Sequence, residues 1–365
     1  MKTNPPGTKT AGLLPVFCDN KETASGGSFA GSHLVIPAPT SSEKHHLLRL
    51  PNWLGDLILA LPSVHLYQRW LQNRAPLIVL GPPSLAPLAP LLLPGIEYIP
   101  APTVPLALHY SVLQKKKISS AVAFPNSLRA ALEIQSIPYR AGFDRGLRNF
   151  LLSEQKPRRT SPYGYVHVAD QYLGLLEDLG LPKGKAELSQ PPILSKPKDA
   201  PAQPYLAVLP GAAYGSAKRW DPTSFASIIR DLKKSHCLEP VLLGGPGDVQ
   251  ACQAVSQSLG SPITDLSGKT STLDLAHWLA HARLILCHDS GPMHLASFLQ
   301  KPAVAIFGST EPAWTGPLGN SVTVVRHKVS CSPCFLKTCP LDRRCMTRLT
   351  PGEVLESCHQ ALATS

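Results

Sequence analysis

A loop of small and basic residues in the second half of the chain could bind an anion. It follows the apolar run YLAVL and reads PGAAYGSAKRW, from Pro210 to Trp220. Small residues such as Gly211 let backbone N–H groups approach a phosphate, and a helix that begins nearby adds the positive end of its dipole. We predict that Gly211, Lys218 and Arg219 contact a phosphorylated ligand. The alternative is a loop shaped only for packing, with Lys218 in water.

A second segment of this kind reads CHDSGPMHLASFL and also joins a buried strand to a helix. Asp289 and Ser290 suit the N-cap position, Gly291 permits close backbone approach, and Pro292 suits a first helical turn. A phosphate or a sugar hydroxyl would fit against such a helix end. Alternatively, Asp289 or Ser290 only caps the helix, and His294 is a packed, hydrogen-bonded histidine.

Four cysteines near the C-terminus lie within fifteen residues, in the run CSPCFLKTCPLDRRC. Thiolates so close together could hold structural zinc or an iron–sulfur cluster, although the spacing fits no standard zinc pair. Four reduced cysteines in a compact loop are the alternative, and both interpretations stay open. A disulfide scaffold is not expected, because the chain has an odd number of cysteines, nine, and no export signal. The four residues are Cys331, Cys334, Cys339 and Cys345.

Alternating strands and helices must position these segments. Near the start, LLRL predicts a buried strand, PNWLGD a loop, LILALPSVHLYQRWLQ a helix with a kink or restart at Pro62, and PLIVLGP the next strand. Two strands joined by a helix form a βαβ unit and hence part of a parallel sheet. Further on, ISSAVAFPNS predicts a strand with a loop, and LRAALEIQ a helix.

The second half repeats this alternation. Strands are predicted at YLAVLP, PVLLGG, ARLILC and PAVAIFG, and helices at DPTSFASIIRDLKKS, VQACQAVSQSL, TLDLAHWLAHA and MHLASFLQ. The pattern is typical of a doubly wound α/β domain, although neither half carries the GxGxxG fingerprint of dinucleotide sites. We therefore predict an α/β fold with two Rossmann-like domains that face a central cleft.

Composition sets the expected boundaries. Residues 1–44 are rich in Gly, Ser, Thr and Pro, which predicts a disordered extension. The stretch from Ser189 to Pro204 has five prolines, so we expect domains at 45–190 and 205–365 with a linker at 191–204. A chain of 365 residues that is 43% hydrophobic, with mean hydropathy +0.00, suits two soluble domains. Without a long apolar stretch or a leader, we expect a cytoplasmic protein.

Positive charge concentrates in one part of the chain. Of a formal net charge of +11, the segment from Lys115 to Arg159 carries an excess of +7, with ten Lys or Arg against three acidic residues. Such a segment favours an anionic partner, such as nucleic acid, an acidic membrane surface or a phosphorylated substrate. A solvated basic face is the alternative.

Three parts of the chain together resemble glycosyltransferase family 9, particularly its lipopolysaccharide heptosyltransferase II group. They are LRLPNWLGDLILALPSV, PGAAYGSAKRW, and the block from SGKTSTLDLAHWLAHA through CHDSGPMHLASFL to FGSTEPAWTGP. The resemblance runs from about Leu47 to Cys358. It implies a GT-B fold in which the N-terminal domain binds the acceptor and the C-terminal domain binds the nucleotide sugar. It also implies transfer of a heptose from ADP-heptose to the lipopolysaccharide inner core, with inversion at the anomeric carbon.

The same resemblance assigns roles to residues of this chain. Asp56 in NWLGD matches the family's general base, and Lys218 matches its contact to the donor phosphates. Ser127 and Arg129 in NSLRAAL match an acceptor-facing loop, and the donor-site residues are Asp289, Ser290, Gly291 and His294. Two departures leave the acceptor open: the long N-terminal extension, and Leu57 and Ile58 at positions where related sequences vary.

The chemistry of inversion needs residues of these types. One carboxylate must take the proton of the acceptor hydroxyl while positive groups stabilise the departing diphosphate, and Asp56 and Lys218 can divide that work. The alternative for Asp56 is an N-cap. Because the sequence has no Asp-x-Asp pair to hold a divalent ion, we expect lysine and helix dipoles to serve instead, with no cofactor required.

The expected partners are ADP-heptose, the inner-core acceptor and, peripherally, the anionic inner face of the inner membrane. One alternative keeps the family but changes the sugar or acceptor. A rival from another class is a basic nucleic-acid-binding protein with a four-cysteine metal module, although no aromatic residues are interleaved with the basic cluster.

Overall fold

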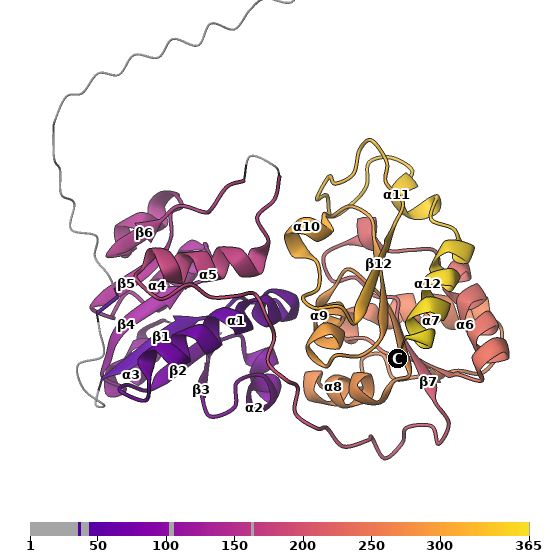
Figure 1. The fold of residues 1–365 in the computed structure, drawn as a ribbon, viewed down its shortest axis with the longest axis horizontal. Helices are drawn as coiled ribbons and strands as arrows, with labels where there is room; N and C mark the ends of the chain where they lie inside the picture. Colours follow the sequence, from indigo (N-terminus) through magenta and orange to yellow (C-terminus); the bar gives the residue numbers. More distant parts are fainter. Residues whose placement is uncertain (1–35, 38–43, 102–105, 162–163, 365) are drawn as a thin grey trace, which may run out of the picture. The chain divides into compact units, whose positions relative to one another are not determined.

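Two six-stranded parallel sheets follow one another along the chain (Figure 1). The computed structural model describes residues 36–37, 44–101, 106–161 and 164–364. Val35–Ser365 form one compact unit that holds both sheets. This is the predicted α/β fold with two doubly wound domains. The prediction for residues 1–44 falls largely outside the described residues, but Ile36 is buried and its N–H donates to the carbonyl of Leu179 at 3.1 Å.

The first sheet has the strand order β3-β2-β1-β4-β5-β6. Its strands are β1 (His45–Arg49), β2 (Leu77–Gly81), β3 (Glu97–Pro100), β4 (Ile118–Ala123), β5 (Tyr139–Phe143) and β6 (Glu154–Lys156). The connecting helices are α1 (Leu54–Leu71), η1 (Pro83–Leu88), α2 (Ala89–Leu92), α3 (Leu106–Lys115), α4 (Leu128–Glu133), η2 (Gly146–Leu151) and α5 (Val168–Asp178), where η marks a 3₁₀ helix.

The second sheet has the order β12-β11-β10-β7-β8-β9. Its strands are β7 (Tyr205–Leu209), β8 (Glu239–Leu242), β9 (Thr264–Asp265), β10 (Leu284–His288), β11 (Ala303–Phe307) and β12 (Val322–Arg326). Its helices are η3 (Ser216–Lys218), α6 (Pro222–His236), η4 (Pro246–Asp248), α7 (Val249–Leu259), α8 (Thr272–His281), α9 (Gly291–Phe298), α10 (Pro312–Thr315), α11 (Arg344–Thr347) and α12 (Pro351–Ala363).

Both sheets reverse their strand order at one point. In the first, β1 lies between β2 and β4, and in the second, β7 lies between β8 and β10. In open parallel sheets, ligands bind outside the carboxyl ends of the strands at such a switch point. The topology therefore singles out the segments that follow β1, β4, β7 and β10.

Alternate strand residues bury opposite faces of each sheet. On β1, Leu48 packs into a core shared with α1, α5, α8 and α9, whereas Leu47 packs on the face covered by α3 and α4. On β7, Ala207 joins the shared core and Val208 faces α6, α7 and α12. Because the shared core contains residues of both halves, apolar packing extends from one sheet to the other.

The helix after β1 begins earlier than the sequence indicated. Leu54, Gly55 and Asp56, assigned to a loop, form the first turn of α1. The helix also does not restart at Pro62, which lies buried inside it. Burial of α1 against the sheet and neighbouring helices offsets the one backbone hydrogen bond that a proline removes.

The proline-rich stretch between the sheets is held against the second half. The carbonyl of Leu194 accepts a hydrogen bond from His281 at 2.8 Å, and that of Ser195 one from His277 at 2.9 Å. Its residues carry no helix or strand in the structure. These two hydrogen bonds therefore hold the stretch against α8.

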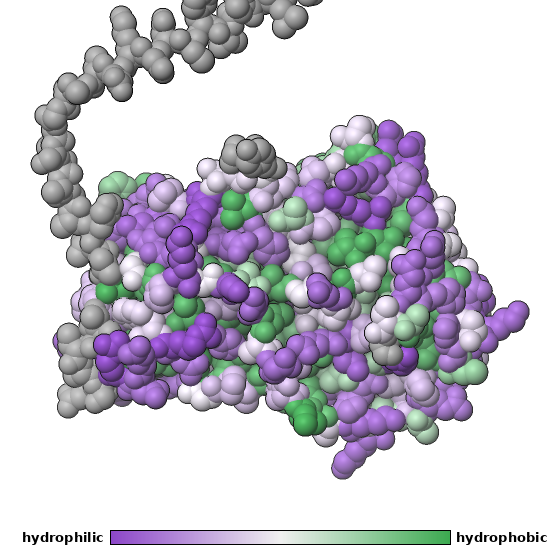
Figure 2. Space-filling model, viewed as in Figure 1, coloured by the Kyte–Doolittle hydropathy of each residue, from purple (hydrophilic) through white to green (hydrophobic). Residues whose placement is uncertain are grey.

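Among the described residues, no helix is long and apolar enough to cross a membrane. Figure 2 shows hydrophilic residues over much of one face, interrupted by smaller apolar areas.

Candidate active site

A cavity of about 360 Å³ opens where the segments after β1, β7 and β10 meet. The first half contributes the start of α1, including Asp56. The second half contributes Lys218 from the small-residue loop and Asp289 from the start of α9. The rest of the lining is Trp53, Gly55, Leu59, Ala213, Tyr214, Ser290, Gly291, His294, Thr310, Trp314, Thr315 and Phe335. Three segments that the sequence singled out therefore share one cavity.

Asp56 lies in the first turn of α1, and the N-cap position belongs to Trp53. Burial raises the pKa of the Asp56 carboxyl above its usual value, and the charge of Asp289 raises it further, whereas Lys218 and Arg158 oppose the shift. A carboxylate with a raised pKa is a better proton acceptor than an ordinary aspartate. The capping alternative for Asp56 is not what the structure shows.

Lys218 is buried and forms an ion pair with Asp289. Its Nζ lies 2.5 Å from Asp289 Oδ2 and donates to the Asp289 carbonyl at 3.2 Å. Thr310 donates its hydroxyl proton to the same carboxylate oxygen. The ammonium also lies 5.0 Å from the ring centre of Tyr214. Asp289 thus orients the lysine and does not cap α9, and Lys218 is not in water.

The two halves approach each other closely at the starts of α1 and α9. A Cβ atom on Gly55 would lie 2.6 Å from His294 Cδ2, and one on Gly291 would lie 3.0 Å from Leu54 Cβ. Ser290 is the N-cap of α9, but its hydroxyl donates to the carbonyl of His288 and caps no N–H of the helix. Burial lowers the pKa of His294 to about 4, so its imidazole is neutral near pH 7.

A buried histidine fixes the small-residue loop to β10. His288 Nδ1 donates to the carbonyl of Gly211 at 3.2 Å, and its Nε2 accepts from the N–H of Trp220 at 2.8 Å. One imidazole thereby holds both ends of the loop. Burial lowers its pKa to about 4, which keeps Nε2 available as an acceptor.

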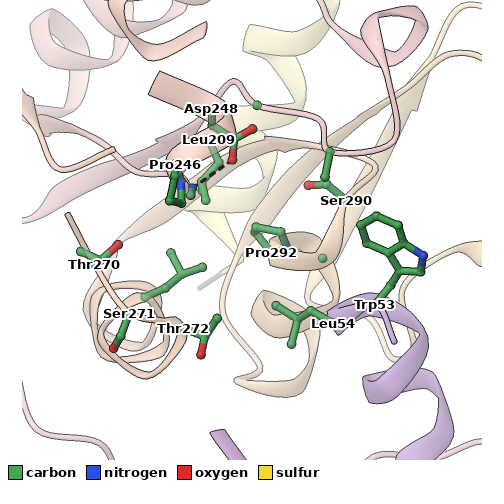
Figure 3. Close-up of a pocket in the computed structure, with 17 residues that line it drawn as sticks. Trp53, Leu54, Leu209, Pro246, Asp248, Thr270, Ser271, Thr272, Ser290 and Pro292 are labelled. Carbon is green, nitrogen blue, oxygen red and sulfur yellow. Dashed lines mark hydrogen bonds between the residues drawn. The ribbon is translucent and has the colours of Figure 1, made fainter. Parts of the chain in front are cut away.

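An adjoining cavity of about 320 Å³ extends from Trp53 and Ser290 toward the ends of β7 and β8 (Figure 3). Gly211 lines it, and a Cβ there would overlap the carboxylate of Asp248. Asp248 accepts the N–H of Gly245 at 3.0 Å, so it orders the glycine turn after β8. Figure 3 shows Thr270, Ser271 and Thr272 on the same cavity.

Several residues of this site were missed from the sequence. Asp248 lies in GGPGD, which follows a buried strand just as the two stronger motifs do. Trp53 is 62% exposed and borders both cavities, but a single tryptophan in a loop gave no signal of its own, because isolated exposed apolar residues are common on protein surfaces. Thr310 had no sequence signal, since its role depends on the placement of Asp289.

Three predicted residues lie elsewhere. Arg219 lines a separate cavity of about 220 Å³ with Trp220 and Gln250. Ser127 is the N-cap of α4 and accepts the N–H of Ala130 at 3.3 Å. Arg129 pairs with Glu133 at 3.1 Å. None of the three lines the two cavities of the cleft, so the geometry does not bring them to Asp56 or Lys218.

A group of arginines from the basic segment lies on the Asp56 side of the cleft. Arg148 is buried, and burial together with Arg145 and Arg158 lowers its pKa to about 10. Its Nη1 donates to the carbonyl of Pro125 at 2.8 Å, whereas Nε and Nη2 are buried with no hydrogen-bond partner among the described residues. The guanidinium carbon of Arg158 lies 5.2 Å from the ring centre of Phe143, and the charge of Arg158 lowers the pKa of Asp56.

The cysteine run supports the small-residue loop from behind. Ala217 N–H donates to the carbonyl of Lys337 at 3.0 Å, and the hydroxyl of Tyr214 donates to that of Phe335 at 2.7 Å. Cys331, Cys334, Cys339 and Cys345 border one small cavity as free thiols. The described residues contain no group of three or more Cys, His, Asp or Glu arranged to hold a metal, so the structural-metal prediction gains no support.

Comparison with known proteins agrees with this geometry. Residues 109–344 match the family described as Glycosyltransferase family 9 (heptosyltransferase). The lipooligosaccharide heptosyltransferase 2 of Campylobacter jejuni is 30% identical over 333 residues, which cover 87% of this chain and 98% of that protein. The chain belongs to glycosyltransferase family 9.

Other family 9 proteins extend the likeness. The lipopolysaccharide heptosyltransferase 2 of Escherichia coli is 28% identical over 314 residues, or 76% of this chain and 88% of that one. The structure of the E. coli ADP-heptose lipopolysaccharide heptosyltransferase II superposes with a TM-score of 0.73 at 25% identity, covering 88% of this chain and 99% of that chain. This family 9 chain is therefore a glycosyltransferase with the GT-B fold.

Proposed function

We propose that this family 9 enzyme transfers a heptose from ADP-heptose to the inner core of lipopolysaccharide, with inversion. The observation that carries the proposal is the cavity in which a carboxylate of high proton affinity, Asp56, faces the buried Lys218–Asp289 pair. The relatives named heptosyltransferase 2 support the choice of sugar and acceptor. We place the reaction in the cytoplasm, with residues 45–190 as acceptor domain, 191–204 as linker and 205–365 as donor domain.

The reaction needs one displacement at the anomeric carbon. The acceptor hydroxyl oxygen forms a bond to this carbon as the bond to the diphosphate oxygen breaks, and ADP leaves with the electron pair. Asp56 takes the hydroxyl proton. Lys218 stabilises the negative charge that grows on the departing diphosphate, and the N-terminal end of α9 adds its dipole.

The cavity bordered by Asp248 suits the nucleotide end of the donor. It is lined by Gly211, Gly244 and Gly245, where backbone can approach a ligand closely, and it joins the Lys218 cavity at Ser290 and Gly291. A nucleoside placed there would direct its diphosphate to Lys218. No cofactor is needed for this division of work, since a lysine and a helix end supply the positive charge.

The acceptor side is basic. The exposed Arg158 lies near enough to Asp56 to lower its pKa. Phosphate or carboxylate groups of an inner-core acceptor would pair with its guanidinium group. Ser127 and Arg129 stay predicted acceptor contacts. Family membership favours this enzyme over the nucleic-acid-binding rival, and a family 9 enzyme with another sugar or acceptor is the alternative.

The donor and acceptor can be tested directly. Purified protein is incubated with a truncated lipopolysaccharide core and a panel of nucleotide sugars, and the core is analysed by mass spectrometry. We expect a mass gain of one heptose with ADP-heptose alone. A gain with a different sugar would support the alternative within the family, and no gain with any donor would contradict the proposal.

Substitution of Asp56 separates catalysis from donor binding. In Asp56→Asn the side chain keeps its shape but no longer accepts the proton, so turnover should fall by about 10²-fold or more while ADP affinity stays near the parental value. Steady-state kinetics and calorimetry with ADP measure the two. The matched control is Asp170→Asn, which changes an exposed aspartate in the first turn of α5. Parental turnover in Asp56→Asn would remove Asp56 from the mechanism.

The acid side of the pH profile reports on the same carboxyl group. A general base works only when ionised, so the raised pKa of Asp56 places the loss of activity at a higher pH than an ordinary aspartate would. Arg158 lowers this pKa, and Arg158→Gln should therefore move the loss to still higher pH. The exposed Arg348, on the other half, gives the control Arg348→Gln. Profiles of kcat/KM against pH, which report the groups of the free enzyme, would refute the assignment if they coincided for the parent and Arg158→Gln.

A further inference from the structure

A short 3₁₀ helix of the first half presents two large apolar side chains to solvent. In η2, Leu147 is 74% exposed and Phe150 is 87% exposed. Side chains three residues apart eclipse each other in a 3₁₀ helix, so both project on the same side. Arg148 between them points the other way and is buried. The sequence GLRNFL thus exposes two of its three large apolar residues and buries its charged one, the reverse of the usual arrangement.

Hydrogen bonds hold this turn in place. Arg140 Nε donates to the carbonyl of Leu151 at 2.7 Å, and Gln155 Nε2 donates to that of Asn149 at 3.0 Å. The N–H of Arg145 donates to Asn149 Oδ1 at 2.9 Å. Anchored at both ends, the turn cannot fold its leucine and phenylalanine inward without breaking these contacts.

The surroundings of the exposed pair are positive. Arg145 is exposed and reaches Asn126 at 3.0 Å, and η2 packs on α4, where Leu128 and Arg129 are also exposed. Part of the positive charge of the basic segment is compensated, since Arg129 pairs with Glu133 and Arg159 with Glu177 and Asp178. Arg145 and Arg158 are exposed and form no ion pair with an acidic side chain among the described residues.

We propose that the η2 turn is a membrane-docking surface, in which Leu147 and Phe150 insert between lipid headgroups and the flanking arginines bind anionic lipid. Two apolar side chains within a basic surface suit the interface of an anionic bilayer. They give far less apolar area than a stable protein interface buries. The proposal rests on the proposed function for its purpose, because an acceptor anchored in lipid would then meet the enzyme near its basic side.

The position of the turn links docking to the active site. Arg158 lowers the pKa of Arg148, which lies on the inner side of η2, and it also lowers the pKa of Asp56, so its guanidinium group lies near both side chains. Docking through the outer side of η2 would therefore place the lipid surface close to Arg148 and Arg158, in the half of the chain that carries Asp56, the proposed base.

Vesicle binding tests the proposal without any sugar transfer. The full chain is sedimented with vesicles of phosphatidylcholine, or of an equimolar mixture of phosphatidylcholine and phosphatidylglycerol, at low and high salt. We expect binding to the mixed vesicles that weakens with salt. The double variant Leu147→Ser, Phe150→Ser should bind the mixed vesicles about tenfold or more weakly, because the apolar insertion is lost.

Two further variants sharpen the result. Ile193 is 101% exposed between α5 and β7, so Ile193→Ser removes an equally exposed apolar residue elsewhere and should bind like the parent. Arg145→Gln should weaken binding to the mixed vesicles and reduce its salt dependence. Absence of parental binding, or a double variant that binds like the parent, would overturn the proposal.

Activity separates this proposal from the proposed function. Toward a core acceptor freed of its acyl chains, the double variant should turn over like the parent, because no residue of the cleft is changed. If the double variant turns over normally and also binds vesicles like the parent, the docking proposal is refuted and the proposed function is not. Absence of turnover in the parent would refute the proposed function and leave the vesicle result to decide docking.

Discussion

The active site depends on one buried ion pair, Lys218–Asp289. Two charges leave water at the carboxyl edge of the second sheet, which is costly unless each is paired and hydrogen-bonded. Here the carboxylate binds both Lys218 and the hydroxyl of Thr310. The pair also sets the field at Asp56, since Lys218 favours the ionised carboxylate while burial and Asp289 disfavour it. The raised pKa of Asp56 is what its proposed role as a general base requires.

Sheet topology explains why these residues meet. Lys218 follows β7 and Asp289 follows β10, which are adjacent strands at the switch point of the second sheet. Asp56 follows β1 at the switch point of the first. Glycines let the halves close on each other: Gly55 makes room for His294, and Gly291 for Leu54. The basic segment, and with it the η2 turn, belongs to the half that carries Asp56, the proposed base, where we propose that a lipid-anchored acceptor arrives.

The sequence predicted the parts of this arrangement that are local. Strand-loop-helix patterns placed the segments around Asp56, Lys218 and Asp289, and the structure brings all three to one cavity. What depended on three-dimensional contact was not predictable. The Lys218–Asp289 pair joins residues far apart in the chain, and Arg219, next to Lys218, turns to a different cavity. Ser127 also stands away from both cavities, because its hydroxyl caps α4. Burial of Arg148 and exposure of Phe150 follow from how one short turn is anchored, which no periodicity reveals.

The account's central claim is a single displacement across the cleft, with Asp56 taking a proton on one side and Lys218 stabilising the leaving group on the other. The most direct measurement is the anomeric configuration of the product, followed by NMR from the first turnovers with a donor of known configuration. A single displacement predicts the opposite configuration at the transferred carbon. Retention would contradict the account, because it requires a different chemical route from the one that Asp56 and Lys218 are proposed to support.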